Sequence, residues 1–277
     1  MGAGVVVNTN ISSIHAARVL SKNRTDLETA MARLASGKRL NSASDDAAAS
    51  SVASKMKADI RSTDVAVRNI NDGISLFQTV DGVASTVEDM LIRMRELAVQ
   101  MTSETYDDTD RENADKEFAA LTAEIERIAT KSAFNRINLA DGVSTTQVQI
   151  QSGADDGDQL SALDLPDLTA SNLGVSAAGI STAAAALAAV ASVDDAILDV
   201  AEYRADTGAT INRLGFALSN AQNVSQRLKE ALSGLEDTDY AAESAALARG
   251  MVLAQAGSAM LAQANQAPQY VLTLLRG

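Results

Sequence analysis

Apolar residues recur at alternating steps of three and four over most of this 277-residue chain, a spacing that predicts long amphipathic α-helices. A first helix is predicted over residues 8–36, with Gly37 as a plausible stop. A second, much longer helix is predicted over 45–101, where the apolar stripe has a mean step close to 3.5. Two further helical segments are predicted at 107–130 and 181–235.

The helical period is lost between residues 134 and 170. Glycines and Pro166 punctuate this stretch, and the run TQVQIQ alternates in the manner of a strand, which together predict one or two β-hairpins. Helices with coiled-coil spacing need partners. The expected fold is therefore mainly α: a long rod of antiparallel coiled-coil helices that pairs the N- and C-terminal thirds, with small β-hairpins in the middle segment.

Residues 250–275 contain no Lys, Arg, Asp, Glu or His. The stretch is long enough to cross a bilayer, but amides such as Gln255 and Gln263 would need partners that lipid cannot supply. A coiled-coil seam is instead predicted at Leu247, Met251, Ala254, Ser258, Leu261 and Asn265. A helix that is neutral nearly all round is normally buried on every side, so something outside this chain is expected to bury it.

Composition favours thin, rod-like helix packing over a thick globular core. Aromatic residues make up 3% of the chain, and Trp and Cys are absent, so no disulfide or cysteine metal site is expected. The net charge is −13, with fifteen acidic and five basic residues between 100 and 170, which argues against a nucleic-acid partner. The six basic residues of the first 40 are scattered round a helix, which favours a solvated face over a phosphate-binding patch.

The sequence contains none of the residue patterns that would indicate an enzyme or a cofactor site. His15 is the only histidine, and the acidic run GADDGDQL lacks the spacing and closing Glu of a calcium loop. Neither phosphate-binding nor dinucleotide-binding glycine motifs occur. No cleaved signal peptide is expected either, because the first basic residue is Arg18 and no apolar segment follows a basic start.

Several motifs together resemble the bacterial flagellins. The segment NTNISSIHAARVLSKNRTDLETAMARLASGKRLNSASDDAAASSVASKM resembles the N-terminal region of that family. The match continues with NDGISLFQTVDG, MRELAVQ and FNRINLADG. Three later segments resemble the C-terminal region of the family: RADTGATINRL, LEDTDYAAESA and AGSAMLAQANQAPQYVLTLLRG. The resemblance covers almost the whole chain.

This resemblance implies a structural subunit that self-assembles into the flagellar filament for swimming motility, after type III export to the cell exterior. It implies an inner filament-core domain of 1–44 with 237–277, a rod domain of 45–236, and absence of the variable outer domains. Neighbouring copies would then bury the charge-free tail. The residues expected to carry filament-core assembly are Ile11, Ile14, Leu20, Leu27, Met31, Leu34, Leu247, Met251, Ala254 and Leu261.

The resemblance also implies partners. They are a flagellar export chaperone on the C-terminal tail, the filament cap and junction proteins, and an animal Toll-like receptor that senses flagellin. Matched residue by residue, the receptor contacts are Arg93, Leu97, Gln100 and Glu117. The first three follow i, i+4, i+7 spacing beside the apolar seam, which predicts one surface with Arg93 pointing outward. Packing against a neighbouring subunit would explain the same residues.

Flagellins can carry O-linked sugars on exposed Ser and Thr. The candidates in the loop-rich part are Ser144, Thr145, Thr146, Thr169, Ser171 and Ser176, with ordinary polar turns as the alternative. Two other classes of protein compete with a filament subunit. A hook–filament junction protein shares the terminal helices, and a membrane-active translocator would bind liposomes instead of polymerising.

Overall fold

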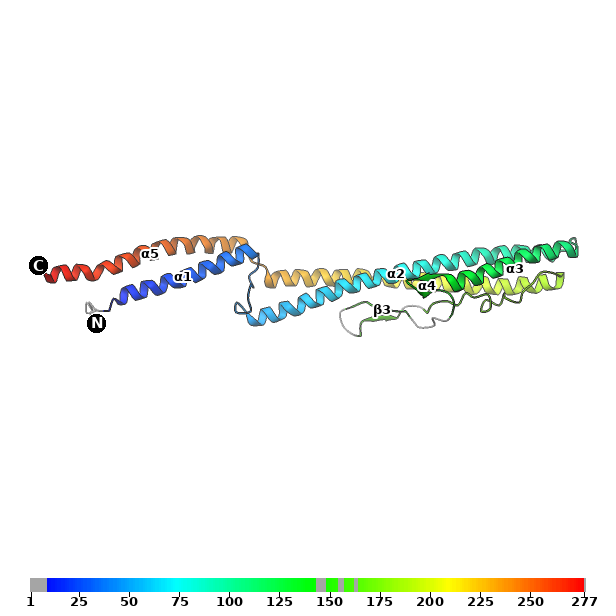
Figure 1. Cartoon of the computed structure of the whole chain (residues 1–277), viewed down its shortest axis with the longest axis horizontal. Coiled ribbons are helices and arrows are strands. Elements are labelled where there is room, and N and C mark those ends of the chain that lie inside the picture. Colours follow the sequence, from blue (N-terminus) through cyan, green and yellow to red (C-terminus); the bar gives the residue numbers. More distant parts are fainter. Residues whose placement is uncertain (1–8, 143–147, 154–156, 162–163, 277) are drawn as a thin grey trace. The chain divides into compact units, whose positions relative to one another are not determined.

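Long helices make up most of the computed structural model, which describes residues 9–142, 148–153, 157–161 and 164–276 (Figure 1). Within this part of the chain the elements are, in order, α1 (Ile11–Ser36), α2 (Ala47–Met101), α3 (Asp108–Lys131), β1 (Ala133–Phe134), β2 (Ile137–Asn138), β3 (Gln149–Gln151), β4 (Gln159–Ser161), α4 (Ala183–Glu236) and α5 (Tyr240–Arg276). The strands form two antiparallel pairs, β1 with β2 and β3 with β4. The predicted fold class, mainly α with small β-hairpins in the middle, is confirmed.

Side-chain caps set the helix starts one to three residues inside the predicted ones. The Asn10 side chain accepts a hydrogen bond from the Ser13 amide at 3.0 Å and begins α1. Asp46 and Asp107 do the same for α2 and α3, accepting from the amides three residues on. Each cap satisfies a backbone donor that has no partner within the helix. Gly37 ends α1 in the left-handed conformation, at φ +70°.

The chain divides into two compact units. We call residues 1–58 with 227–277 the terminal unit and residues 59–226 the middle unit. The two boundaries fall inside α2 and α4, so each of these helices contributes to both units. The domain boundaries predicted from the sequence, at 44/45 and 236/237, fall between helices and not inside them. That division into an inner domain and a rod domain remains a prediction.

The core of the middle unit lies along the predicted stripe of α2. Phe77, Val80 and Leu91 are fully buried there, and the seam of α4 supplies Val193, Val200 and Leu214. α3 adds Phe118 and Ile125. These large apolar side chains at coiled-coil spacing supply the main driving force for packing the three helices.

Polar contacts show that α2 and α4 run antiparallel. Arg95 on α2 pairs with Asp194 on α4, and Arg204 on α4 bridges Asp81 and Glu88 on α2. Further along, the Ser225 hydroxyl donates to Asp64 Oδ1 at 2.7 Å. The partner number falls on one helix as it rises on the other, so the N- and C-terminal parts of the chain pair as predicted.

The hairpins pack on this helical core. Ile150 of β3 is buried, and its side chain lies so close to Gly73 of α2 that a Cβ there would stand 2.3 Å from Ile150 Cδ1. In the sequence Gly73 reads as a local weakness of the helix, worth about 1 kcal/mol. Its role in the fold is to admit β3 against α2.

Candidate interaction surface

α1 and α5 of the terminal unit pack side by side as an antiparallel pair (Figure 1). At one end, the Asn10 Nδ2 donates to the Ala264 carbonyl oxygen at 2.7 Å, and the Ser13 hydroxyl donates to Asn265 Oδ1 at 2.7 Å. At the other end, the Tyr240 hydroxyl donates to the Leu34 carbonyl oxygen at 3.0 Å. The pair is therefore held in one register along its length.

The seam of this pair uses glycines that the sequence-based prediction passed over. Leu20 of α1 lies over Gly257 of α5, and Leu27 lies over Gly250, with 3.3–3.4 Å between a leucine methyl and the position of an added Cβ. The predicted seam positions Met251 and Ser258 are exposed instead, and Gly250 and Gly257, one residue earlier, face α1, whereas Leu247, Ala254 and Leu261 of the predicted seam are half-buried. Glycine lets the two backbones approach, whereas the flanking larger residues are turned outward.

The predicted assembly residues consequently fall into two groups. Leu20 is buried and five others are half-buried between the two helices: Leu27, Leu34, Leu247, Ala254 and Leu261. The remaining four are exposed, namely Ile11, Ile14, Met31 and Met251. Val252, Leu253 and Met260 on α5 are also exposed, Met260 to 65%. Pairing thus leaves much of the apolar surface of both helices uncovered.

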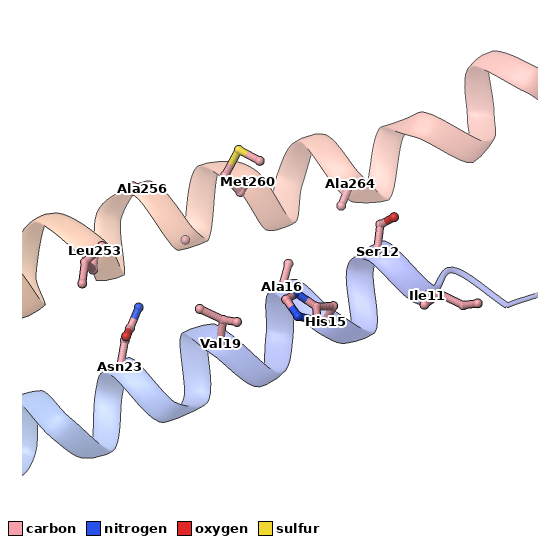
Figure 2. A pocket seen from close by; sticks show the side chains of 11 residues that line it. Ile11, Ser12, His15, Ala16, Val19, Asn23, Leu253, Ala256, Met260 and Ala264 are labelled. Atoms are coloured by element: carbon pink, nitrogen blue, oxygen red, sulfur yellow. The ribbon is translucent and has the colours of Figure 1, made fainter. Parts of the chain in front are cut away.

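Part of that surface forms a groove of about 620 Å³ along the two helices (Figure 2). Eleven residues line it: Ile11, Ser12, His15, Ala16, Val19 and Asn23 from α1, and Leu253, Ala256, Gly257, Met260 and Ala264 from α5. The lining is mostly aliphatic, with His15 as its one titratable side chain. Grooves of this kind accept apolar side chains or an apolar helix face.

The segment Tyr240–Gln266 of α5 is long and apolar enough, by length and composition alone, to cross a membrane. None of its most apolar window is buried within the chain. Contiguous apolar surface of this extent marks an interaction site in a soluble protein or a lipid-facing segment. In either case, the molecule that would cover this surface lies outside the individual subunit.

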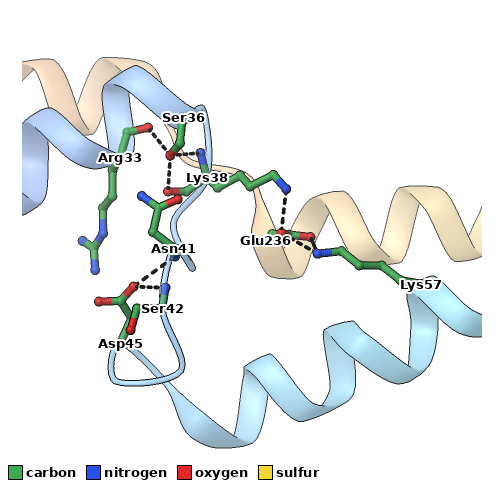
Figure 3. Close-up of polar contacts among 8 residues, drawn as sticks. All are labelled: Arg33, Ser36, Lys38, Asn41, Ser42, Asp45, Lys57 and Glu236. Atoms are coloured by element: carbon green, nitrogen blue, oxygen red, sulfur yellow. Dashed lines mark hydrogen bonds and ion pairs between the residues drawn. The ribbon is translucent and has the colours of Figure 1, made fainter.

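A polar cluster links the turn after α1 to the turn before α5 (Figure 3). Glu236 is buried to 6% exposure and accepts from Lys57 Nζ at 2.7 Å and from Lys38 Nζ at 3.0 Å. Backbone bonds lie beside it: the Arg39 amide donates to the Glu236 carbonyl oxygen at 2.7 Å, and the Thr238 amide donates to the Gly37 carbonyl oxygen at 3.0 Å. Hydrogen bonds from Lys57 first, and from Lys38, lower the pKa of the Glu236 carboxyl below 4.5, against the effect of burial.

Replacing Glu236 with Gln should loosen this cluster at neutral pH only. Because the pKa of Glu236 is lower in the folded state than its ordinary value of 4.5, the ionised carboxylate stabilises the fold at pH values above 4.5. This stabilisation is lost as the pH falls through the folded-state pKa. Because both lysines are partly exposed, we expect about 1 kcal/mol, or roughly fivefold faster amide exchange at Arg39 and Thr238 at pH 7. At acidic pH, below the lowered folded-state pKa of Glu236, the parent carboxyl is protonated and parent and variant should match. A difference that persists there would show that Glu236 acts through packing instead of charge.

Three of the predicted receptor contacts lie on one face of the middle unit. Arg93 is exposed and donates from Nε and Nη2 to Glu117 Oε1 at 3.0 and 2.9 Å. Gln100, also exposed, donates to the Tyr106 hydroxyl at 3.0 Å. Glu117 and Glu96 raise the pKa of Arg93 by hydrogen bonding to it. The fourth residue corrects the expectation of one exposed surface: Leu97 is 4% exposed and belongs to the core cluster of the middle unit.

The glycosylation candidates occupy different surroundings. Ser171 and Ser176 are exposed in the turns that precede α4. Thr169 is half-buried, and its hydroxyl donates to Asp167 Oδ1 at 2.6 Å, so it serves the turn itself. Ser144, Thr145 and Thr146 lie outside the described residues.

Both ends of the chain match family models. Residues 7–145 match the bacterial flagellin N-terminal helical region, and residues 190–275 match the bacterial flagellin C-terminal helical region. Among similar sequences, a flagellin of Halalkalibacterium halodurans is 42% identical over 98% of this chain and 100% of its own length. A flagellar filament 30.7 kDa core protein of Treponema maltophilum is 35% identical over 98% of this chain and 100% of its own length.

Solved structures give a concordant picture. The crystal structure of Bacillus cereus flagellin is similar with a TM-score of 0.51 and 32% identity, over 56% of this chain and 88% of that one. A putative flagellar hook-associated protein from Vibrio parahaemolyticus reaches a TM-score of 0.56 over 70% of this chain and 100% of its own. At 16% identity that second likeness shows the fold alone.

Proposed function

This chain belongs to the flagellin family and is a structural subunit of the bacterial flagellar filament, and we propose that its copies assemble through the outward apolar faces of α1 and α5. The filament lies outside the cell. The sequence relatives named above are filament proteins, so nothing favours the hook–filament junction alternative. In this proposal the inner domain comprises 1–44 with 237–277, and 45–236 forms the rod.

The observation that carries the proposal is the uncovered apolar surface of the terminal helices. Side chains such as Ile14, Val252 and Met260 stay exposed although α1 and α5 pack against each other. Burying them stabilises an assembly by roughly 25 cal/mol for each Å² of apolar surface removed from water. A filament repeats this contact in every subunit.

Seeded growth tests the proposal. Full-length protein added to filament fragments is expected to extend them, as seen by electron microscopy. A chain ending at residue 236 is expected to remain monomeric, because it lacks α5. Leu261→Asp, which places a charge in the half-buried helix pair, should also block growth. Normal extension by the truncated chain would exclude α5 as an assembly element.

The export route and the other partners extend the same proposal. We propose type III export without a cleaved signal, with a chaperone covering the apolar tail in the cytoplasm, and cap and junction proteins meeting the terminal helices. An uncharged apolar segment is an aggregation hazard until a groove-forming partner shields it. Co-purification of an export chaperone with the full chain, but not with residues 1–236, is the expected result. Equal recovery with both would contradict it.

We further propose that the Toll-like receptor contact uses Arg93, Gln100 and Glu117, with Leu97 supporting them from the core. The Arg93–Glu117 ion pair presents both residues at one exposed place. Arg93→Ala should weaken binding of the monomer to the receptor ectodomain about tenfold. An Arg93→Ala monomer that binds as tightly as the parent but fails to polymerise would assign the residue to assembly alone.

O-glycosylation is proposed at the exposed Ser171 and Ser176, with Ser144, Thr145 and Thr146 as further candidates. Intact-mass measurement of native filament subunits tests this. A mass equal to that of the bare chain would exclude the modification.

A further inference from the structure

Pro268 lies inside α5, which runs as one helix from Tyr240 to Arg276. In a regular helix the amide of residue 268 would donate to the carbonyl oxygen of Ala264, but proline has no amide hydrogen. Ala264 is half-buried, so water has limited access to this oxygen. A polar backbone atom in such a place costs free energy unless another group donates to it. α5 therefore contains a carbonyl that lacks its regular helical donor.

The missing donor comes from α1. Asn10 Nδ2 donates to the Ala264 carbonyl oxygen at 2.7 Å, while Asn10 Oδ1 accepts from the Ser13 amide at 3.0 Å. Only this orientation of the side-chain amide satisfies both partners, because one of them is an acceptor and the other a donor. Serine or aspartate would also cap α1, but neither combines that acceptor with an amide donor that reaches α5. Asn10 thus begins α1 and completes α5 where Pro268 interrupts its hydrogen bonding.

The other end of the helix pair is held in a similar way. α1 ends two residues after Leu34, so the carbonyl oxygen of Leu34 has no regular helical donor either. The Tyr240 hydroxyl of α5 donates to it at 3.0 Å. The two bonds are 24 residues apart along both helices, from 10 to 34 and from 240 to 264, so one antiparallel register forms both. Sliding one helix past the other would break them together.

We propose that Asn10 and Pro268 couple the end of α5 to α1: the helical conformation of residues beyond 264 depends on pairing with α1 in this register. Without α1, the Ala264 carbonyl has neither its helical donor nor Asn10, and α5 is weakest at this point. With α1 in place, one side chain closes the gap. The coupling acts within a single chain, and it does not depend on which molecule covers the outward faces of the pair.

A cycle of single and double substitutions, read by amide hydrogen exchange, tests the coupling. Asn10→Ser keeps a cap for α1 but removes the donor to α5, and should speed exchange at residues 265–275 about fivefold. Pro268→Ala gives residue 268 an amide that closes the gap from within α5. Adding Asn10→Ser to the Pro268→Ala chain should therefore change exchange by less than about twofold. Mass spectrometry measures exchange in free subunits and in filaments, and the coupling is expected in each state in which the parent protects these amides.

Ser13→Ala is the matched control. It removes the neighbouring bond from the Ser13 hydroxyl to Asn265 Oδ1, which does not involve the carbonyl that Pro268 leaves open, so its effect should be the same with and without Pro268. An equal effect of Asn10→Ser in the two backgrounds would overturn the proposal. So would a parent chain in which residues 265–275 are unprotected in both states, because α5 would then not continue as a helix past Ala264.

Discussion

Met260→Asp is expected to abolish growth on filament seeds while leaving the free subunit folded. Met260 is 65% exposed on α5 and lines the groove, so the free subunit tolerates a carboxylate there, in contact with water. In the assembly the same carboxylate would be buried without a partner, at a cost of several kcal/mol in each subunit. Electron microscopy measures the growth, and circular dichroism measures the helical content of the free chain.

Met260→Leu is the matched control, because it keeps an apolar side chain of similar volume. It should grow on seeds at close to the parent rate. If Met260→Asp extends filaments as well as Met260→Leu does, the groove is not covered by a neighbouring copy. If Met260→Asp loses helical content as a free subunit, the residue belongs to the fold of the pair instead of to its outer face.

Arg111→Met is expected to destabilise the middle unit by about 3 kcal/mol. Arg111 is 7% exposed and donates to three carbonyl oxygens at the end of α2 and in the turn after it: Met101 at 3.2 Å, Ser103 at 2.7 Å and Tyr106 at 2.7 Å. These carbonyls have lost their helical partners, and methionine fills the space without donating to them. The midpoint of urea unfolding, followed by circular dichroism, measures the loss.

Arg127→Met on the same helix is the control. The Arg127 side chain is 60% exposed and pairs with Glu124 one turn away, an arrangement that contributes little in water. Its midpoint should match that of the parent. Equal midpoints for the Arg111 and Arg127 variants would show that the end of α2 does not depend on the buried guanidinium.

The helical core was predictable from the sequence because its signal is local and periodic. Large apolar residues such as Phe77, Leu91 and Leu214 recur at steps of three and four, and the structure buries them. The β-hairpins were predictable as a class, because the loss of period and the turn residues are visible in the sequence. The register of the α5 seam could not be predicted from the sequence, because Gly250 and Gly257 carry no apolar side chain that would mark them as seam positions.

Polar contacts between distant residues were also hidden. Asp115 and Glu126 of α3 accept from the amides of Ile180 and Ala170, at 2.7 and 2.9 Å, and so fasten the segment that leads into α4. In the sequence they read as members of an acidic stretch, and Arg111 reads as one more solvated charge. Leu97 was predicted as a receptor contact on one surface with Arg93 and Gln100, and it is buried in the core cluster of the middle unit. Such contacts depend on tertiary structure and leave no periodic trace.

The candidate surface was predictable in part. The charge-free stretch 250–275 indicated burial by something outside the chain, and the exposed apolar side chains of α5 agree with that. Composition and spacing did not identify the covering molecule. The proposal that copies cover one another comes from the flagellin motifs.

Thiol labelling of single-cysteine variants tests the central claim most directly, because the natural chain contains no cysteine. Met260→Cys should react quickly with a thiol reagent in the free subunit and become protected in the filament. Leu20→Cys, buried between α1 and α5, should react slowly in both states. Equal reactivity of Met260→Cys in free subunits and in filaments would contradict assembly through the outward faces of the terminal helices.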